Sequence, residues 1–212
     1  MGKPPHLRLV GRNILSTEEN ADGRRQRGER SRRQIADAML AVIGRGEMNP
    51  SAAQVAEEAG VSLRSVFRHF EDMDSLYREM SARIEAEIMP LALRPFDAAD
   101  WRARLMELTK RRAALYERIM PYRVAGAARR FQSTYLMDDY RRMISLEQSS
   151  LKGILPKAII ADAILFAALD AATGFDAWRR LRQDLALSPK KAEAAMRLTV
   201  ERLTATAGTS RA

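Results

Sequence analysis

The sequence of 212 residues contains no cysteine and only two histidines, His6 and His69. The lack of cysteine excludes disulfides and thiolate metal sites, and two histidines so placed exclude a His-based metal site or dyad in the second half of the chain. Long apolar runs are also missing, because the most apolar stretch, 158–175, is interrupted by Asp162 and Asp170. We therefore expect a cytoplasmic protein that does not enter a membrane.

Catalytic signatures are equally scarce in this sequence. It contains no glycine-rich phosphate loop and no pair of acids at metal-binding spacing. Only Asp138 and Asp139 approach a cluster of carboxylates, and adjacent residues point apart on a helix. We expect neither an enzyme nor a bound cofactor, and an all-α enzyme is the least favoured alternative.

Aromatic residues make up only 6% of the chain, and no stretch alternates in the manner of a β-strand. Alanine, leucine, arginine, glutamate and methionine dominate instead, and this composition predicts an all-α fold. The formal net charge of +9 favours a polyanionic partner by electrostatics alone.

The stretch 50–70 has the pattern of two short helices joined by a tight turn. Ser51 and Gln54, three residues apart, form a capping box at the start of the first helix. Gly60 permits the left-handed backbone that the turn needs, and Ser62 is placed to cap the second helix. The pattern predicts a helix-turn-helix, which we interpret as a DNA-reading motif.

The second helix of this motif is expected to have two different faces. Val66 and Phe70 lie four residues apart on its inner side, whereas Arg64 and Arg68 fall on the opposite side. Outward arginines can bond guanine in a major groove, and serines can bond base edges or phosphates. The residues expected to contact DNA are Ser51, Ser62, Leu63, Arg64, Ser65, Phe67, Arg68 and His69.

An alternative interpretation is a helical corner in a bundle, with Arg64 and Arg68 as ordinary solvated charges. The wider context favours DNA reading, because the run 31–80 resembles the DNA-binding domain of the TetR (tetracycline repressor) family of bacterial transcription regulators. The resemblance rests on the lone helix before the motif and on Val55-Ala56, Ala59-Gly60-Val61-Ser62, Val66-Phe67-Arg68-His69-Phe70 and Leu76.

The sequence departs from the usual pattern of that family at two positions. The family's Tyr-x-His-Phe ending is Phe67-Arg68-His69-Phe70 here, so a hydroxyl that reaches a phosphate is missing. Met73 stands where family members often place a lysine. Arg68 and the basic N-terminal segment can compensate, because phosphate neutralisation is additive and largely indifferent to which cation provides it.

The chain is expected to fold in three parts. The first is rich in lysine and arginine, and it either lies in a minor groove or is a solvated tail. A helix should then run from about Gly28 to Gly44, and a fourth helix should run from Asp72 to Pro90. The expected parts are a flexible basic arm at 1–28, a helix-turn-helix DNA-binding domain at 29–76 and a helical ligand-binding and dimerisation domain at 77–212.

Arg112 occupies an inward position on an apolar helical stripe of the last part. It can meet an anionic ligand such as a carboxylate, or it can pair with a buried acid, for which Asp162 and Asp170 are candidates. Pro121 and Gly126 are expected to interrupt the helical pattern, and a long helix is expected to follow them to about Gly153.

Tyrosines and methionines recur at helical spacing through the same region. Such a stripe is either plain core or the lining of a pocket for a mainly apolar molecule, and the family resemblance implies a pocket. The residues expected to line it are Arg112, Tyr116, Met120, Phe131, Tyr135, Tyr140 and Met143.

Two final helices are expected at 156–184 and 188–206, with small residues that permit close approach of another helix. The resemblance implies that they pair with their copies in a homodimer, whereas an intramolecular cap would need no partner. We expect a repressor that binds a near-palindromic double-stranded DNA operator, with half-sites about 34 Å apart, and that a small apolar effector releases. The alternative is an all-α lipid or small-molecule binding protein whose helix-turn-helix is structural.

Overall fold

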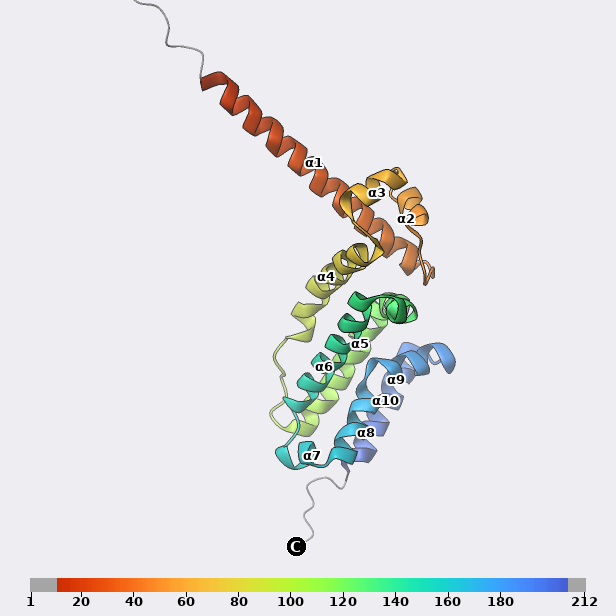
Figure 1. Ribbon diagram of the computed structural model, residues 1–212. Coiled ribbons are helices and arrows are strands. Elements are labelled where there is room, and N and C mark those ends of the chain that lie inside the picture. The colour runs from red at the N-terminus through yellow and green to blue at the C-terminus, as the bar shows by residue number, and fades with distance from the viewer. Residues whose placement is uncertain (1–10, 206–212) are drawn as a thin grey trace, which may run out of the picture.

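The computed structural model describes residues 11–205, of which 11–24 are described by their backbone alone. The described residues form helices and no strand, which confirms the all-α prediction (Figure 1). The N-terminal helices are α1 (Gly11–Gly44), α2 (Ala52–Glu58), α3 (Leu63–His69) and α4 (Met73–Ala92). The remaining elements are α5 (Trp101–Arg129), the 3-10 turn η1 (Arg130–Gln132), α6 (Thr134–Lys152), α7 (Lys157–Ala161), α8 (Ala163–Thr173), α9 (Phe175–Arg179), the π-helical η2 (Arg180–Asp184) and α10 (Pro189–Thr204).

The helix-turn-helix packs on the C-terminal half of α1. Ile35, Met39 and Ile43, spaced by four residues, are fully buried there. They share one core with Val66 and Phe70 of the motif and with the start of α4. Because this core joins the motif to α1 and α4, α2 and α3 are held in place although each has only seven residues.

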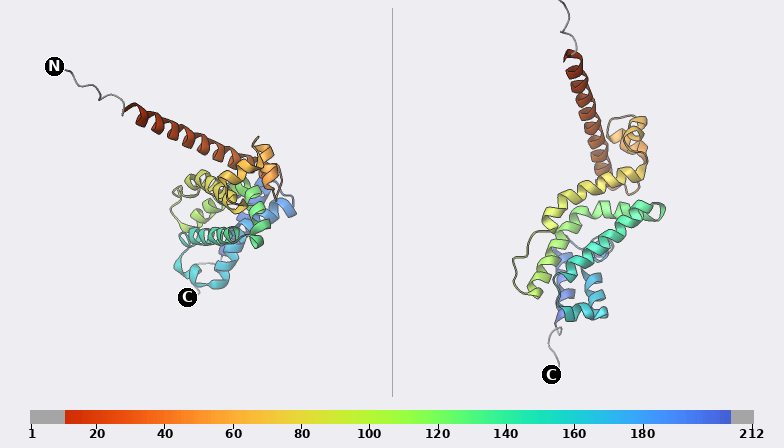
Figure 2. Two further views of the ribbon diagram at one scale, coloured as in Figure 1. Left: turned by 45° about the horizontal axis from the view of Figure 1, so that its top comes forward. Right: turned by 60° about the vertical axis from the view of Figure 1, so that its left-hand side comes forward.

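Helix α1 begins much earlier than the sequence predicted. It starts at Gly11 rather than near Gly28, so residues 11–28, expected in a flexible arm, continue the helix. No proline occurs between Pro5 and Pro50, and an Arg25–Glu29 ion pair of 3.3 Å supports the exposed turns. This part of α1 projects away from the rest of the molecule (Figure 2). Residues 1–10 of the expected arm lie outside the described residues.

Two prolines that were expected to end or break helices lie inside them. Helix α4 continues past Pro90 to Ala92, and α5 continues past Pro121 to Arg129. Proline removes one backbone hydrogen bond of a helix and costs roughly 3 kcal/mol. In α5 the buried Ile119 and Ala125 lie on either side of Pro121, so tertiary packing of this long helix outweighs that cost.

The C-terminal part is built around α5. Leu105 of α5, Leu151 of α6, Leu169 of α8 and Val200 of α10 are fully buried in one core. A second core joins α5 to α9 and α10 around the buried Trp178.

The helix expected at 156–184 is divided into several pieces. Asp162 caps α8 by accepting hydrogen bonds from the amides of Ile164 and Leu165, and the chain is extended again at Gly174. The last helix starts with Ser188 as its cap and Pro189 in its first turn, as the sequence predicts.

The two parts of the molecule share a packed joint. Ala125 of α5 and Leu136 of α6 belong to the core of the helix-turn-helix part. The Ser133 hydroxyl donates a 2.7 Å hydrogen bond to Asp74 near the start of α4. The boundary expected after Leu76 therefore falls inside α4. This helix extends without a break from the helix-turn-helix part into the second part (Figure 1).

Candidate nucleic-acid interface and ligand cavity

The turn before α3 is fixed by local sequence and by α1. Gly60 has a φ of +63°, a conformation that disfavours residues with a Cβ atom. The Ser62 hydroxyl caps α3 by accepting a 3.2 Å hydrogen bond from the Ser65 amide. From α1, the Gln34 side-chain amide donates a 2.7 Å hydrogen bond to the Ala59 carbonyl. These contacts set the point at which α3 starts.

Arg32 of α1 fixes the other end of α3. Its guanidinium donates a 2.8 Å hydrogen bond to the carbonyl of His69, the last residue of α3. It also forms a 3.0 Å ion pair with Glu79 of α4, and it stacks 4.4 Å from the centre of the Phe70 ring. Sequence analysis missed this residue, because its partners are a main-chain oxygen and two side chains distant in sequence. Arg32 thus sets the angle of α3 against α1 and α4.

The outer face of α3 carries exposed basic and apolar side chains. Arg64 and Arg68 are exposed, and within residues 25–205 neither side chain makes a hydrogen bond or an ion pair. Leu63 and Phe67 beside them are 45% and 49% exposed. Two uncompensated guanidinium groups next to apolar side chains suit the floor of a major groove, where arginine bonds guanine and apolar groups contact thymine methyls.

Four other residues expected to contact DNA are partly buried or already use their polar groups within the protein. The Ser51 and Ser62 hydroxyls already serve as helix caps, and Ser65 is half-buried. The Nε2 atom of His69 is buried without a hydrogen-bond partner among the described residues. Burial, and then the charges of Arg68 and Arg32, lower the pKa of His69. At neutral pH this imidazole is therefore uncharged, and it adds no positive charge to the surface.

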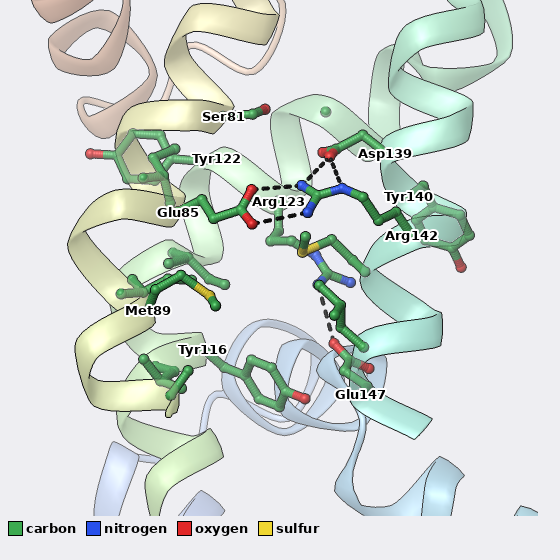
Figure 3. A pocket seen from close by; sticks show the side chains of 18 of the residues that line it. Ser81, Glu85, Met89, Tyr116, Tyr122, Arg123, Asp139, Tyr140, Arg142 and Glu147 are labelled. Atoms are coloured by element: carbon green, nitrogen blue, oxygen red, sulfur yellow. Dashed lines mark hydrogen bonds and ion pairs between the residues drawn. The ribbon is translucent and has the colours of Figure 1, made fainter. Parts of the chain in front are cut away.

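A cavity of about 240 Å³ lies between α4, α5 and α6 (Figure 3). Its walls are mainly apolar, with a few polar groups at its two ends. Helix α4 contributes one whole wall, although the sequence predicted it only as a helix and not as part of a pocket. The wall residues from α4 are Met80, Ser81, Ile84, Glu85, Ile88, Met89 and Ala92.

The structure brings together four of the seven residues expected in a pocket. Arg112, Tyr116, Tyr140 and Met143 line the cavity. The other three lie elsewhere, for reasons that only the packing shows. Met120 packs in the core around Trp178, and Phe131 is 76% exposed in η1. Tyr135 packs against the core of the helix-turn-helix part, and the guanidinium of Arg78 lies over its ring.

Arg112 does not pair with either acid that the sequence suggested. Asp162 caps α8, and Asp170 accepts a hydrogen bond from Gln148. Arg112 is 4% exposed, and it donates to neutral groups: the Thr173 hydroxyl at 2.6 Å, the Thr173 carbonyl at 3.2 Å, the Ser150 hydroxyl at 2.8 Å and the Glu147 carbonyl. Of the two alternatives for Arg112, the buried ion pair is therefore wrong, because oxygens of α6 and α8 replace the carboxylate.

One turn further along α5, Tyr116 faces the same cavity. Its side chain is 4% exposed, and its hydroxyl makes no well-formed hydrogen bond to a described residue, although the Glu147 carboxylate is close enough to interact with it. Arg123 and Glu147 lie nearby and form a 3.1 Å ion pair, with both side chains largely buried (Figure 3). Burial raises the pKa of Tyr116, so the phenol stays protonated and is available as a donor.

At the other end of the cavity, an ion pair connects α4 to α6. The guanidinium of Arg142 forms two parallel hydrogen bonds with Glu85, of 3.0 and 2.9 Å, and a third of 2.8 Å with Asp139 (Figure 3). The hydrogen bonds that Arg142 donates to Glu85, together with those it donates to Asp139, raise the pKa of Arg142 above its ordinary value. Sequence analysis did not find these residues, because acids and arginines on exposed helix faces are usually solvated.

Other kinds of site are missing from the described part of the chain. No group of three or more histidine, aspartate or glutamate side chains between residues 25 and 205 is arranged to hold a metal ion. Nor does any described helix combine the length and the apolarity needed to cross a membrane.

Comparison with solved structures finds the same arrangement of helices in two bacterial proteins. A transcriptional regulator from Rhodococcus sp. Rha1 matches with a TM-score of 0.65 and 18% sequence identity, over 82% of this chain and 96% of that one. A putative TetR-family transcriptional regulator from Mesorhizobium loti MAFF303099 matches with a TM-score of 0.53 and 19% identity, over 85% and 98%. No protein-family model and no curated protein matches the sequence. The chain has the fold of these transcriptional regulators.

Proposed function

We propose that this chain is a homodimeric, sequence-specific DNA-binding transcription regulator, and that it acts as a repressor which a small, largely apolar ligand releases from DNA. The outer face of α3 carries this proposal. Arg64 and Arg68 project from a helix whose two ends are fixed by Ser62 and Arg32, and they have no partner within the described side chains. A rigid helix with free guanidinium groups is what reading of base edges requires.

Exposed apolar surface on α8 and α10 supports the homodimer. Ile164 is 84% exposed and Leu198 is 53% exposed. Around them lie the exposed small residues Ala167, Ala171 and Ala194, over which a second helix can approach closely. Two copies joined through this surface would present two α3 helices to successive major grooves, so a near-palindromic operator is expected.

Helix α4 is the mechanical link in the proposed mechanism. Three residues separate it from α3, and it forms one wall of the cavity. A ligand that fits better when α4 is displaced will favour that position, and the displacement changes the separation of the two α3 helices. The bond between Glu85 and Arg142 has to stretch or break in the process, so it opposes release until a ligand binds.

Selection of DNA from a random duplex pool at physiological salt tests the DNA-binding part. The wild type is compared with Arg64→Ala and Arg68→Ala, with Arg33→Ala of α1 as the control for loss of one exposed charge. We expect an inverted repeat that each α3 variant relaxes at one symmetric pair of positions, with a cost of about 1–3 kcal/mol per lost bidentate contact. Uniform, salt-sensitive binding without sequence enrichment would refute it.

The cavity itself favours a second candidate, an all-α protein that binds lipids or other small apolar molecules and whose helix-turn-helix is structural. The two candidates differ in one outcome of the selection. A binding protein without regulatory function takes up apolar ligands but enriches no operator, whereas the proposed regulator does both.

A further inference from the structure

The charged groups that line the cavity are separated by sign. At the end nearer the helix-turn-helix part, the two acids Glu85 and Asp139 surround Arg142, which leaves one negative charge in excess (Figure 3). At the opposite end, Arg112 and Arg123 accompany the single acid Glu147, which leaves one positive charge in excess. Buried charge of one sign is costly unless it is balanced, so the second end favours an anionic occupant.

Arg111 also lines the cavity, but it does not change this balance. It forms a 2.9 Å ion pair with Glu107 and donates to the carbonyls of Ala92 and Pro95 at 3.2 Å. Its positive charge is thus already compensated beside the cavity. The excess at this end comes from Arg112, whose hydrogen-bond acceptors are all neutral.

Donors for an anion are present at the positive end. The Tyr116 hydroxyl is buried, and it makes no well-formed hydrogen bond to any described residue, although the Glu147 carboxylate lies near it. Arg123 uses one nitrogen for Glu147 and lies 4.4 Å from the centre of the Phe175 ring, so its guanidinium retains further N–H groups. A buried donor without an acceptor costs free energy, and a ligand oxygen at this position removes that cost.

We infer that the cavity binds an amphipathic carboxylate, whose carboxylate accepts hydrogen bonds from Tyr116 and Arg123 beside the charge of Arg112, and whose hydrocarbon part lies along α4. This inference rests on the proposed function, because it assigns a ligand class to the same cavity. The hydrocarbon part contacts Ile84, Ile88 and other apolar side chains of α4. The ligand therefore touches both the fixed helix α5 and the helix that leads to α3.

The test measures the binding of three probes with a linear eight-carbon chain, by isothermal titration calorimetry with the full chain at neutral pH. Octanoate carries the proposed headgroup, methyl octanoate is its neutral counterpart, and octyltrimethylammonium reverses the charge. We expect octanoate to bind at least tenfold more tightly than either of the others. In Tyr116→Phe, which lacks the hydroxyl proposed to donate to the ligand, octanoate should bind about tenfold more weakly. Tyr77→Phe is the matched control, because the Tyr77 hydroxyl is also buried without a partner among the described residues but lies in the core of the helix-turn-helix part, outside the cavity; it should keep the wild-type affinity.

A second variant makes the positive end of the cavity more positive instead of removing a hydrogen-bond donor from it. Glu147→Gln leaves two arginines at this end without an acid, so octanoate should bind more tightly and octyltrimethylammonium more weakly. Equal binding of the three probes, or strongest binding of the cation, would overturn the carboxylate while leaving the cavity as a ligand site. Failure of all three to bind at millimolar concentration would overturn the ligand site as well. Neither result affects the DNA selection, which tests operator binding separately.

Discussion

Replacement of Arg32 by alanine tests whether α3 is held by the three contacts of this side chain. The hydrogen bond to the His69 carbonyl is worth about 1 kcal/mol, and stacking on Phe70 adds roughly 0.5–1 kcal/mol. The ion pair with Glu79 adds only about 0.5 kcal/mol, because the Arg32 side chain is 43% exposed and solvent screens the charges. The expected loss of unfolding free energy is therefore about 2 kcal/mol.

Urea denaturation followed by far-ultraviolet circular dichroism measures this loss, and Arg33→Ala is the control. Arg33 is the exposed neighbour of Arg32, and its side chain makes no hydrogen bond or ion pair to any described residue. Its removal should change stability by less than about 0.5 kcal/mol. Binding to a selected operator should fall about tenfold further in Arg32→Ala than in Arg33→Ala, because only the former shifts α3. Equal stability and equal operator affinity of the two variants would refute the assignment of Arg32.

Three further predictions concern the dimer, the fall of folding stability at low pH and the ion pair between α4 and α6. Ile164→Lys places a charge in the exposed apolar face of α8 and should yield monomers in analytical ultracentrifugation, and a dimer of unchanged affinity would contradict the proposed interface. His69 has a lowered pKa in the folded state, so the unfolded state binds more protons and stability should fall as pH drops from 7 through 6.5 and below; His69→Gln should show a smaller fall in denaturation midpoint, and an identical fall would disprove its role. Arg142→Gln removes the bonds to Glu85, so operator release should occur at a lower ligand concentration in a fluorescence polarisation titration, and an unchanged midpoint would show that this bond does not oppose release.

The helix-turn-helix was predictable because its signals are local. The Ser51 and Gln54 capping box, the positive φ of Gly60 and the Ser62 cap all appear where the sequence placed them. Each signal involves residues no more than three positions apart, so the chemistry of the side chains determines the structure directly.

The candidate site depends more on contacts between distant segments. The partners of Arg112 are hydroxyls and carbonyls on α6 and α8, and a carbonyl leaves no trace in a sequence. Pro121 was expected to break α5, but burial on both sides of it was not visible from local propensity. Phe131 was expected in the pocket from its spacing, yet the turn η1 rotates it into solvent. Tertiary packing decided each of these cases.

The projection of α1 bears on how much DNA the protein would protect from nuclease cleavage. The 20 residues from Gly11 to Arg30 precede Ile35, the first buried residue in the part of α1 whose side chains are described, and they extend roughly 30 Å at 1.5 Å per residue. That length corresponds to about nine base pairs at 3.4 Å each. Exposed Arg25, Arg27 and Arg30 lie along its last turns. A nuclease footprint that reaches about nine base pairs beyond each half-site would show that α1 follows the duplex, whereas a footprint confined to the half-sites would show that it points away.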